Sequence, residues 1–304
     1  MTRSFGLGPM PGTSVAEAAD IIVSETSLPH LPLLPAHGLG YDPVAVTAAM
    51  VPYVSITRGP RGWVLADRPS APRLDGDLDA CEAVWGELPA VKMQALGPFS
   101  LAASVELASG HRAITDRGAL RDLTEALIDG LSDFSRGLAR RFGGDVVVQL
   151  DEPLLPAIVA GQLRGTSDLD SIRAIHPEDL RDGLSSVVSG LDHEVLLNQA
   201  GYAPLWEVAP CEVLVSVDKV RGTAQLDGLG EALSAGRVGL GVARGGSARE
   251  AAVGLARLVA ELGVDPVSLA GVDVFPGSTV LEPARDYAFV AEVAAILECD
   301  AGDL

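Results

Sequence analysis

Short apolar runs alternate with longer amphipathic stretches from about residue 76 to the end of the chain. The short runs carry Val and Leu at successive positions, which is typical of strands buried on both faces of a parallel sheet. They predict strands at Ala90–Leu96, Asp145–Leu150, Val195–Leu197, Val213–Val217, Val238–Val242 and Val272–Phe275. The longer stretches have helical periodicity and predict helices at Arg117–Arg141, Pro177–Leu191, Leu226–Ala235, Ser247–Leu262 and Tyr287–Leu297.

This alternation of strands and helices predicts an α/β fold with a parallel sheet covered by helices. Six units of this kind, with one or two more in the N-terminal third, fit a (β/α)8 TIM-type barrel spanning residues 1–304 as a single domain. An open doubly wound sheet is the alternative. No G-x-G-x-x-G sequence opens the first unit, which disfavours a dinucleotide site.

Residues 1–75 form an irregular, proline-rich N-terminal segment, whereas residues 76–304 hold the main βα units. We expect one clear helix in this segment, from Ser14 to Glu25. The prolines between Leu28 and Pro35 exclude regular structure there, because each lacks a backbone N–H. Tyr53–Ile56 and Trp63–Ala66 predict a small hairpin around a Gly-Pro-Arg-Gly turn.

Composition limits the classes of partner. Apolar residues make up 48% of the 304, enough for a large core, and 22 basic against 41 acidic residues give a net charge of −19. Such a surface repels phosphate backbones and anionic headgroups, so we expect no nucleic acid and no membrane as partner. We find neither a signal peptide nor a transmembrane run, and three widely spaced cysteines do not suggest disulfides; a cytoplasmic protein is expected.

Polar residues follow the predicted strands. In a parallel barrel the site is built at the carboxyl ends of the strands, so these residues are the candidates for a pocket that binds a small molecule. They are Gly97, Ser100, Asp151, Glu152, Asn198, Asp218, Arg244 and Ser278. The histidines and cysteines show no metal-ligand spacing and no recognisable catalytic triad.

Each of these candidates has a structural interpretation beside the functional one. Asp151 or Glu152 would bind an ammonium group or act as a base, or else cap a helix or pair with an arginine. Asp218 is next to Lys219, which would neutralise it. Asn198 would orient a ligand or simply form a turn. Arg244 with the Gly-Gly-Ser that follows resembles an anion cradle at a helix N-terminus, or else is a surface arginine.

Three segments, Gly6–Thr13, Lys92–Ser100 and Gln149–Pro153, resemble the C-terminal catalytic barrel of cobalamin-independent methionine synthase. The likeness is to short single-domain members from high-GC (actinobacterial-type) bacteria and follows the same order along nearly the whole chain. It implies a (β/α)8 barrel that transfers a methyl group from a folate to the thiol of homocysteine. In that family a zinc ion holds the thiol as a thiolate.

Most residues of the family's zinc site are replaced. Its His-x-Cys pair falls on Asn198–Ala200, its acid on Asp218 and its last cysteine on Ser278. The Gly-Ser that holds the amino-acid carboxylate reads Gly8-Pro9, and the segment with the proton-transfer histidine falls on Arg244–Ser247. We therefore expect no cofactor, with Asp218 as a remnant ligand position; zinc is expected only if the family chemistry holds despite these changes.

Three hypotheses follow. The first is a divergent barrel without zinc that binds a small polar or amino-acid-like ligand through Asp151, the residue that grips the substrate's amino group in the family. The second is an active thiol methyltransferase with a non-standard site. The third is a non-catalytic regulatory or scaffold protein. The sequence leaves the ligand, the methyl donor, the catalytic residues, the oligomeric state and the physiological role open.

Overall fold

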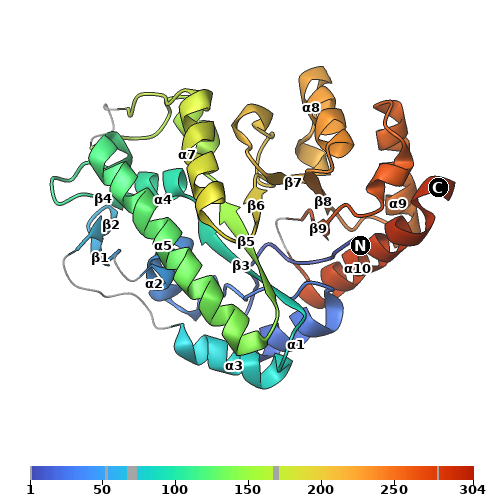
Figure 1. Ribbon diagram of the computed structural model, residues 1–304, viewed down its shortest axis with the longest axis horizontal. Coiled ribbons are helices and arrows are strands. Elements are labelled where there is room, and N and C mark those ends of the chain that lie inside the picture. Colours follow the sequence, from blue (N-terminus) through green and yellow to red (C-terminus); the bar gives the residue numbers. More distant parts are fainter. Residues whose placement is uncertain (1, 52–53, 67–73, 167–170, 279–280) are drawn as a thin grey trace.

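The structure is a computed structural model that describes residues 2–51, 54–66, 74–166, 171–278 and 281–304. Its centre is a curled, wholly parallel sheet with the strand order β3-β5-β6-β7-β8-β9 (Figure 1). The strands are β3 Ala90–Leu96, β5 Asp145–Asp151, β6 Glu194–Asn198, β7 Glu212–Ser216, β8 Val238–Val242 and β9 Val274–Pro276. The order never reverses, so the sheet lacks the switch point of a doubly wound fold.

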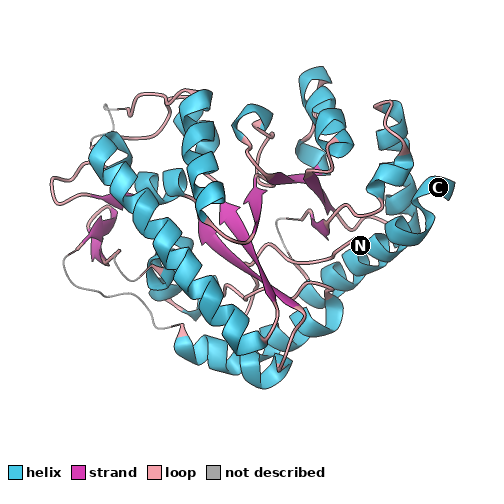
Figure 2. Cartoon of the chain, viewed as in Figure 1, coloured by secondary structure: helices cyan, strands magenta, loops and turns pink. Residues whose placement is uncertain are grey.

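Helices cover the outer face of this sheet and follow its strands (Figure 2). They are α1 Val15–Glu25, α2 Pro43–Met50, α3 Asp75–Trp85, α4 Pro98–Ser104, α5 Arg117–Phe142, α6 Leu155–Val159, α7 Pro177–Gly190, α8 Thr223–Ser234, α9 Ala248–Glu261 and α10 Pro283–Asp300. The predicted strands and helices are all present, with ends that differ by four residues or fewer. Among the described residues, no helix combines the length and apolar character needed to cross a bilayer.

Six strands are present in this sheet where the sequence predicted a barrel of eight. Two extended N-terminal segments lie along its two edges: Phe5 N donates to Val274 O at 3.2 Å, and Leu31 N donates to Lys92 O at 2.9 Å. Ser4 O accepts from Leu28 N at 3.1 Å, which joins the two segments. Neither segment continues as a strand, and prolines at 29 and 32 remove donors that a ladder at the second edge would need.

The N-terminal 75 residues hold more regular structure than predicted. Helix α1 begins after its N-cap Ser14, as expected, but α2 is a second helix in this segment, so the expectation of a single helix was wrong. Asp42 caps α2 by accepting from Val44 N and Ala45 N, a signal that the density of prolines concealed. The predicted hairpin is confirmed as antiparallel β1 Ile56–Gly59 and β2 Gly62–Leu65; Tyr53 lies outside the described residues. Parallel to β2 runs β4, Val105–Glu106.

Apolar side chains pack on both faces of the parallel sheet. The larger cluster lies between the sheet and its helices. A second, smaller cluster includes Phe5, Val147, Leu196, Leu214 and Phe275, and the rings of Phe5 and Phe275 stack with centroids 6.2 Å apart. Strand register places this smaller cluster on the inner, concave face. On the sheet itself, the space left for a functional site is therefore at its two ends.

Candidate functional site

Asp151 and Asn198 lie opposite each other at the carboxyl ends of β5 and β6. Asn198 Nδ2 donates to Asp151 Oδ1 at 2.7 Å, and Gln149 Nε2 donates to the same oxygen at 2.7 Å. Burial raises the pKa of the Asp151 carboxyl, and these two amide hydrogen bonds oppose the rise. Asp151 Oδ2 accepts no hydrogen bond from the described residues, so one oxygen is available to a cationic ligand.

A buried polar chain supports Asp151 from inside the sheet. Lys92 is fully buried, and its Nζ donates to Gln149 Oε1 at 2.6 Å. Burial lowers the pKa of Lys92 to about 7, while the negative charge of Asp151 opposes the shift. The chain Lys92–Gln149–Asp151 therefore fixes both the position of the carboxylate and the orientation of the Gln149 amide that supports it.

A cavity of about 430 Å³ lies between the N-terminal segment and the residues that follow β9. Leu7, Met10, Pro276, Ser278 and Tyr287 are among its lining residues, so its wall is mostly apolar. The link to Asp151 is Gln149, whose Nε2 also donates to the carbonyl oxygen of Leu7 at 2.9 Å. Of the predicted residues, Ser278 lines this cavity; Asp151 is not among its lining residues and is connected to it only through the contact of Gln149 with Leu7.

Gly97, Ser100 and Glu152 form a second group, at the ends of β3 and β5. Glu152 is fully buried, and its carboxylate accepts from Phe99 N at 3.0 Å and Ser100 N at 2.8 Å, at the N-terminus of α4. A Cβ at Gly97 would lie 2.4 Å from Glu152 Oε1, so only glycine fits there. Burial raises the pKa of Glu152 to about 7. These contacts hold α4 against β5; ligand binding by this group stays a prediction.

Asp218 and Arg244 each have partners within the protein. Asp218 pairs with Lys219 at 2.9 Å. Arg244 Nε lies 2.8 Å from Asp286 Oδ1, and Arg244 also pairs with Glu282 at 3.3 Å. The N-terminus of α9, where an anion cradle was one interpretation, is closed by a capping box in which Ser247 N donates to Glu250 Oε2 at 2.8 Å. A binding role for Arg244 stays a prediction.

Sequence reasoning did not select Lys92, Gln94 and Gln149 as site residues. They are polar residues at alternate positions of apolar strands, and the register pairs Gln94 with Gln149 on the inner face. Gln94 is 4% exposed; its Nε2 donates to Leu31 O at 2.8 Å, while its Oε1 has no partner among the described residues. The sequence signal that could have identified them is the recurrence of polar residues at every second position of an otherwise apolar strand.

The comparisons place this geometry on a known fold. No family model and no curated protein matches the chain. A solved structure described as a methyltransferase from Methanosarcina mazei matches with a TM-score of 0.52 and 15% identity, over 93% of this chain and 85% of that one. The protein shares the fold of that structure. A B12-independent methionine synthase from Shewanella sp. W3-18-1, solved with selenomethionine, matches with a TM-score of 0.49 and 12% identity, over 84% and 77% of the two chains.

The residues at the carboxyl ends do not fit a zinc site. Asn198 offers only an amide oxygen, which accepts from Ala200 N at 3.0 Å, and Asp218 is paired with Lys219. Protein zinc sites combine three or four imidazole, thiolate or carboxylate ligands, and of the positions that the family uses only the carboxylate of Asp218 remains here. A protein without zinc stays a prediction, and this donor set supports it.

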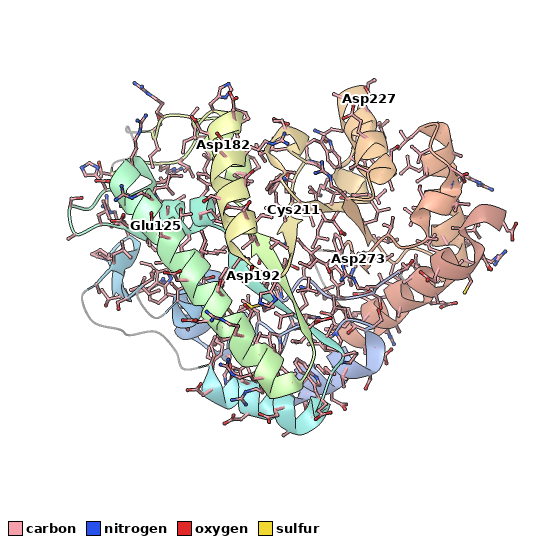
Figure 3. The ribbon with its side chains drawn as sticks, viewed as in Figure 1. Glu125, Asp182, Asp192, Cys211, Asp227 and Asp273 are labelled. Atoms are coloured by element: carbon pink, nitrogen blue, oxygen red, sulfur yellow. The ribbon has the colours of Figure 1, made fainter. Side chains whose placement is uncertain are left out.

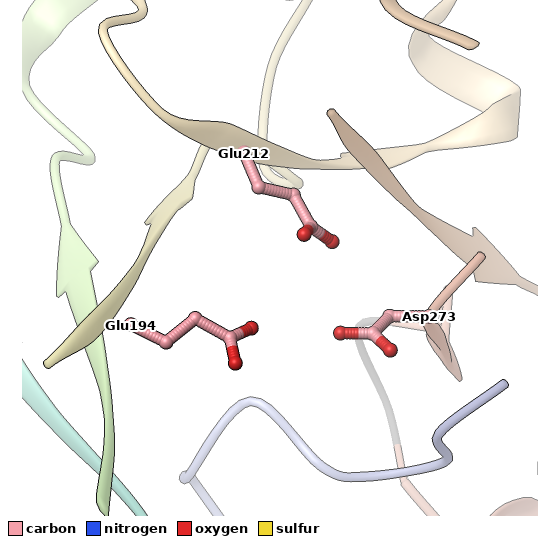
Figure 4. Close-up of side chains that lie close together, drawn as sticks. All are labelled: Glu194, Glu212 and Asp273. Atoms are coloured by element: carbon pink, nitrogen blue, oxygen red, sulfur yellow. The ribbon is translucent and has the colours of Figure 1, made fainter. Parts of the chain in front are cut away.

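Among the described residues, the potential metal ligands that do cluster lie near the amino ends of the strands. Glu194, Glu212 and Asp273 place carboxylate oxygens within 4.8 Å of one another (Figure 4). Arg3 occupies the space between two of them: its Nε lies 2.9 Å from Asp273 Oδ1, and its Nη1 lies 2.8 Å from Glu194 Oε2. The guanidinium supplies the positive charge here, so this cluster is an ion-pair network.

Proposed function

We propose that this protein binds a small ligand with an ammonium group and an apolar part, such as an amino acid with a thioether or thiol side chain. The Asp151 carboxylate carries the proposal, since its Oδ2 accepts no hydrogen bond from the described residues and Gln149 connects it to Leu7, which lines an apolar cavity of about 430 Å³. Gln149 and Asn198 hold Oδ1, so the carboxylate is oriented before a ligand arrives. A preorganised carboxylate binds an ammonium group at a lower entropic cost than a mobile one.

The apolar wall would take the ligand's side chain. Leu7, Met10 and Pro276 offer contacts to a thioether or alkyl chain, and Ser278 offers a hydroxyl at the carboxyl end of β9. Binding would bring a cation next to Asp151. Burial disfavours the ionised form of an unpaired carboxyl group, and a bound cation would stabilise it. In this proposal, ligand binding lowers the pKa of Asp151 toward its ordinary range, and binding weakens as the pH falls below it.

Methyl transfer to a thiol is the second candidate, and the methyltransferase fold favours it. In this chain, thiol activation would have to proceed without the family's zinc. Lys92 is the nearest basic group that the structure connects to Asp151, but it is fully buried behind Gln149. A protein that binds the amino acid without turning it over is therefore favoured, with methyl transfer as the outcome that a turnover assay would reveal.

Calorimetric titration with L-methionine tests the proposal. We expect saturable binding by the wild type and at least tenfold weaker binding by Asp151→Asn, which keeps the shape but loses the charge, a difference of about 1.4 kcal/mol or more. Asp227→Asn, at an exposed position on α8, is the matched control and should bind as the wild type does. Omitting the amino group, with 4-(methylthio)butanoate as ligand, should abolish binding.

Two outcomes would overturn this proposal. Failure of the wild type to bind L-methionine and L-homocysteine would remove the amino-acid ligand class. Equal affinity of Asp151→Asn and the wild type would remove Asp151 as the anchor. A homocysteine methylation assay separates the two candidates, because turnover would establish the methyltransferase. Zinc analysis of protein purified without chelator then shows whether a metal takes part.

A further inference from the structure

A larger cavity, of about 960 Å³, lies outside the sheet against α5 and α7. The two helices run side by side in Figure 1, and Figure 3 labels Glu125 on α5 and Asp182 on α7. Among the described residues, its lining has none in common with the cavity that Leu7 and Ser278 line. It is therefore a second space, to which the proposed function assigns no role.

The floor of this cavity is apolar. Phe99 and Ile114 are buried beneath it, and the partly buried side chains of Leu120, Ile128, Ile172 and Ile175 complete the surface. These residues come from α4, α5 and the segments that precede α5 and α7. A hollow of this size with an apolar floor is within the range of small-ligand pockets.

Its rim is cationic, in a chain with a net charge of −19. Four arginines line it against two carboxylates, Glu125 and Asp179. Arg117 and Arg173 are exposed and make no ion pair or hydrogen bond with the described residues. Arg112 donates its Nε to Arg164 O at 3.0 Å and its Nη1 to Ala103 O, so carbonyl oxygens hold it and no described carboxylate neutralises it.

The fourth arginine is already neutralised. Arg121 lies 2.8 Å from Asp122 and 3.8 Å from Glu125, on the exposed face of α5. Within the part of the chain that the structure describes, three guanidinium groups around this one apolar hollow, those of Arg112, Arg117 and Arg173, thus have no acidic partner. A cluster of unpaired like charges is unfavourable by itself, and an anion bound among them would relieve the repulsion.

We infer that this cavity binds an amphipathic organic anion, a carboxylate or a phosphate monoester with an apolar body. The body would lie on the floor formed by Phe99 and the isoleucines. The anionic group would pair with Arg117 and Arg173, whose planar guanidinium groups match two oxygens of a carboxylate or phosphate. Arg112, fixed by two carbonyl oxygens, adds a positive charge of constant position.

Titration with decanoate and with decyl phosphate tests this inference by calorimetry. We expect one-to-one saturable binding of at least one probe, weakening as NaCl is raised. The double variant Arg117→Gln/Arg173→Gln should bind at least tenfold more weakly. Arg140→Gln/Arg257→Gln removes the same charge from exposed arginines outside the cavity and should bind as the wild type does. The stronger probe identifies the anionic group as carboxylate or phosphate.

Either of two results would overturn the inference: no saturable binding of both probes by the wild type, or equal affinity of the two double variants. The Asp151→Asn variant tests the two sites separately, because the substitution affects the proposed amino-acid site and leaves the arginines of this cavity unchanged. It should bind the anionic probe normally, and a loss of probe binding in Asp151→Asn would place the probe in the other cavity. Unchanged thermal transitions would show that the substituted arginines, all exposed, leave the fold intact.

Discussion

Asp151 and Glu152 are neighbours in the sequence, yet their carboxylates meet different surroundings. Asp151 is the last residue of β5 and faces the inside of the sheet, where side-chain amides hold it. Glu152 follows the strand and accepts two backbone N–H groups from α4. Alternation of side chains along an extended chain separates the two. The carboxylate of Asp151 is therefore held by side-chain amides on the inner face of the sheet, and that of Glu152 by the backbone of α4.

Glu212 allows the effect of one buried carboxyl group on the stability of the fold to be measured. Burial, with the nearby charges of Asp273 and Glu194, raises the pKa of Glu212 to about 8, although Arg3 opposes the rise. Because the folded state holds this proton more tightly than the unfolded state, the stabilising contribution is complete below pH 4.5 and is lost as the pH rises through 8. Glu212→Gln should therefore raise the free energy of unfolding by about 2 kcal/mol at pH 8.5 and change it little at pH 4.5.

Urea unfolding at the two pH values measures this effect. The exposed Glu231→Gln on α8 is the control, with the same change in net charge and no expected dependence on pH. A Glu212→Gln variant that is less stable than the wild type at pH 8.5 would show that Arg3 neutralises all three carboxylates and that the Glu212 charge stabilises the fold.

At the scale of elements, α5 shows how sequence signals fix the two ends of a helix and its buried face. It begins after Asp116, which accepts from Gly118 N and Ala119 N, and ends at Gly143, whose φ of +80° suits the left-handed cap. Its buried residues include Leu123, Leu127 and Leu131 at a spacing of four. Sequence signals at both ends and along one face explain why this helix was predicted almost to the residue.

Two glycines in α5 give a matched pair of predictions. A Cβ at Gly130 would lie 2.7 Å from the Cα of Val51, whereas a Cβ at Gly137 would meet nothing within 4 Å. Gly137→Ala should stabilise the protein by about 1 kcal/mol through helix propensity. Gly130→Ala should destabilise it by about 1–3 kcal/mol, because the clash with backbone outweighs the same gain. Denaturant unfolding of both variants measures the difference. Equal stabilisation by the two substitutions would mean that Val51, the residue after α2, does not pack on α5 at Gly130.

At the scale of the whole molecule, polar groups concentrate at the two ends of the parallel sheet and an apolar layer separates them. The ion pairs of Arg3 lie near the amino ends of the strands, and the Asp151–Asn198 pair lies at the carboxyl ends. Phe5, Leu196 and Phe275 belong to the apolar layer between them. This division agrees with the proposed function, which puts the ligand at the carboxyl ends and leaves the ion pairs of the amino ends to stabilise the fold.

The net charge of −19 predicts a dependence of stability on salt. Like charges across the surface repel one another in the compact state. NaCl at 0.3 M weakens this repulsion, because the screening length falls below about 10 Å. We expect the melting temperature at pH 7.5 to rise by about 2–4 °C from 10 mM to 0.3 M NaCl, which corresponds to about 1 kcal/mol. Near pH 4.5, the isoelectric point of the sequence, the rise should disappear. A fall in melting temperature at pH 7.5 would instead mean that attractive ion pairs dominate.

The sequence by itself determined the order of strands and helices and the parallel α/β class, because buried strands and amphipathic helices carry local hydrophobic periods. It also selected Asp151, since polar residues at strand ends stand out in an apolar sequence. It missed α2 and the inward-facing Lys92 and Gln149, whose signals lay within a proline-rich segment and within the strands themselves.

Only the tertiary structure decided how many strands form the sheet, which carboxylates have hydrogen-bond or ion-pair partners, and where the cavities lie. Six strands form because the two N-terminal segments meet the sheet edges through isolated pairings. Glu152 and Arg244 have partners from elements distant in sequence, and Arg112, Arg117 and Arg173 meet around one hollow for the same reason. Local patterns specify elements, but the partner of a charge depends on contacts between elements, and these exist only in the folded chain.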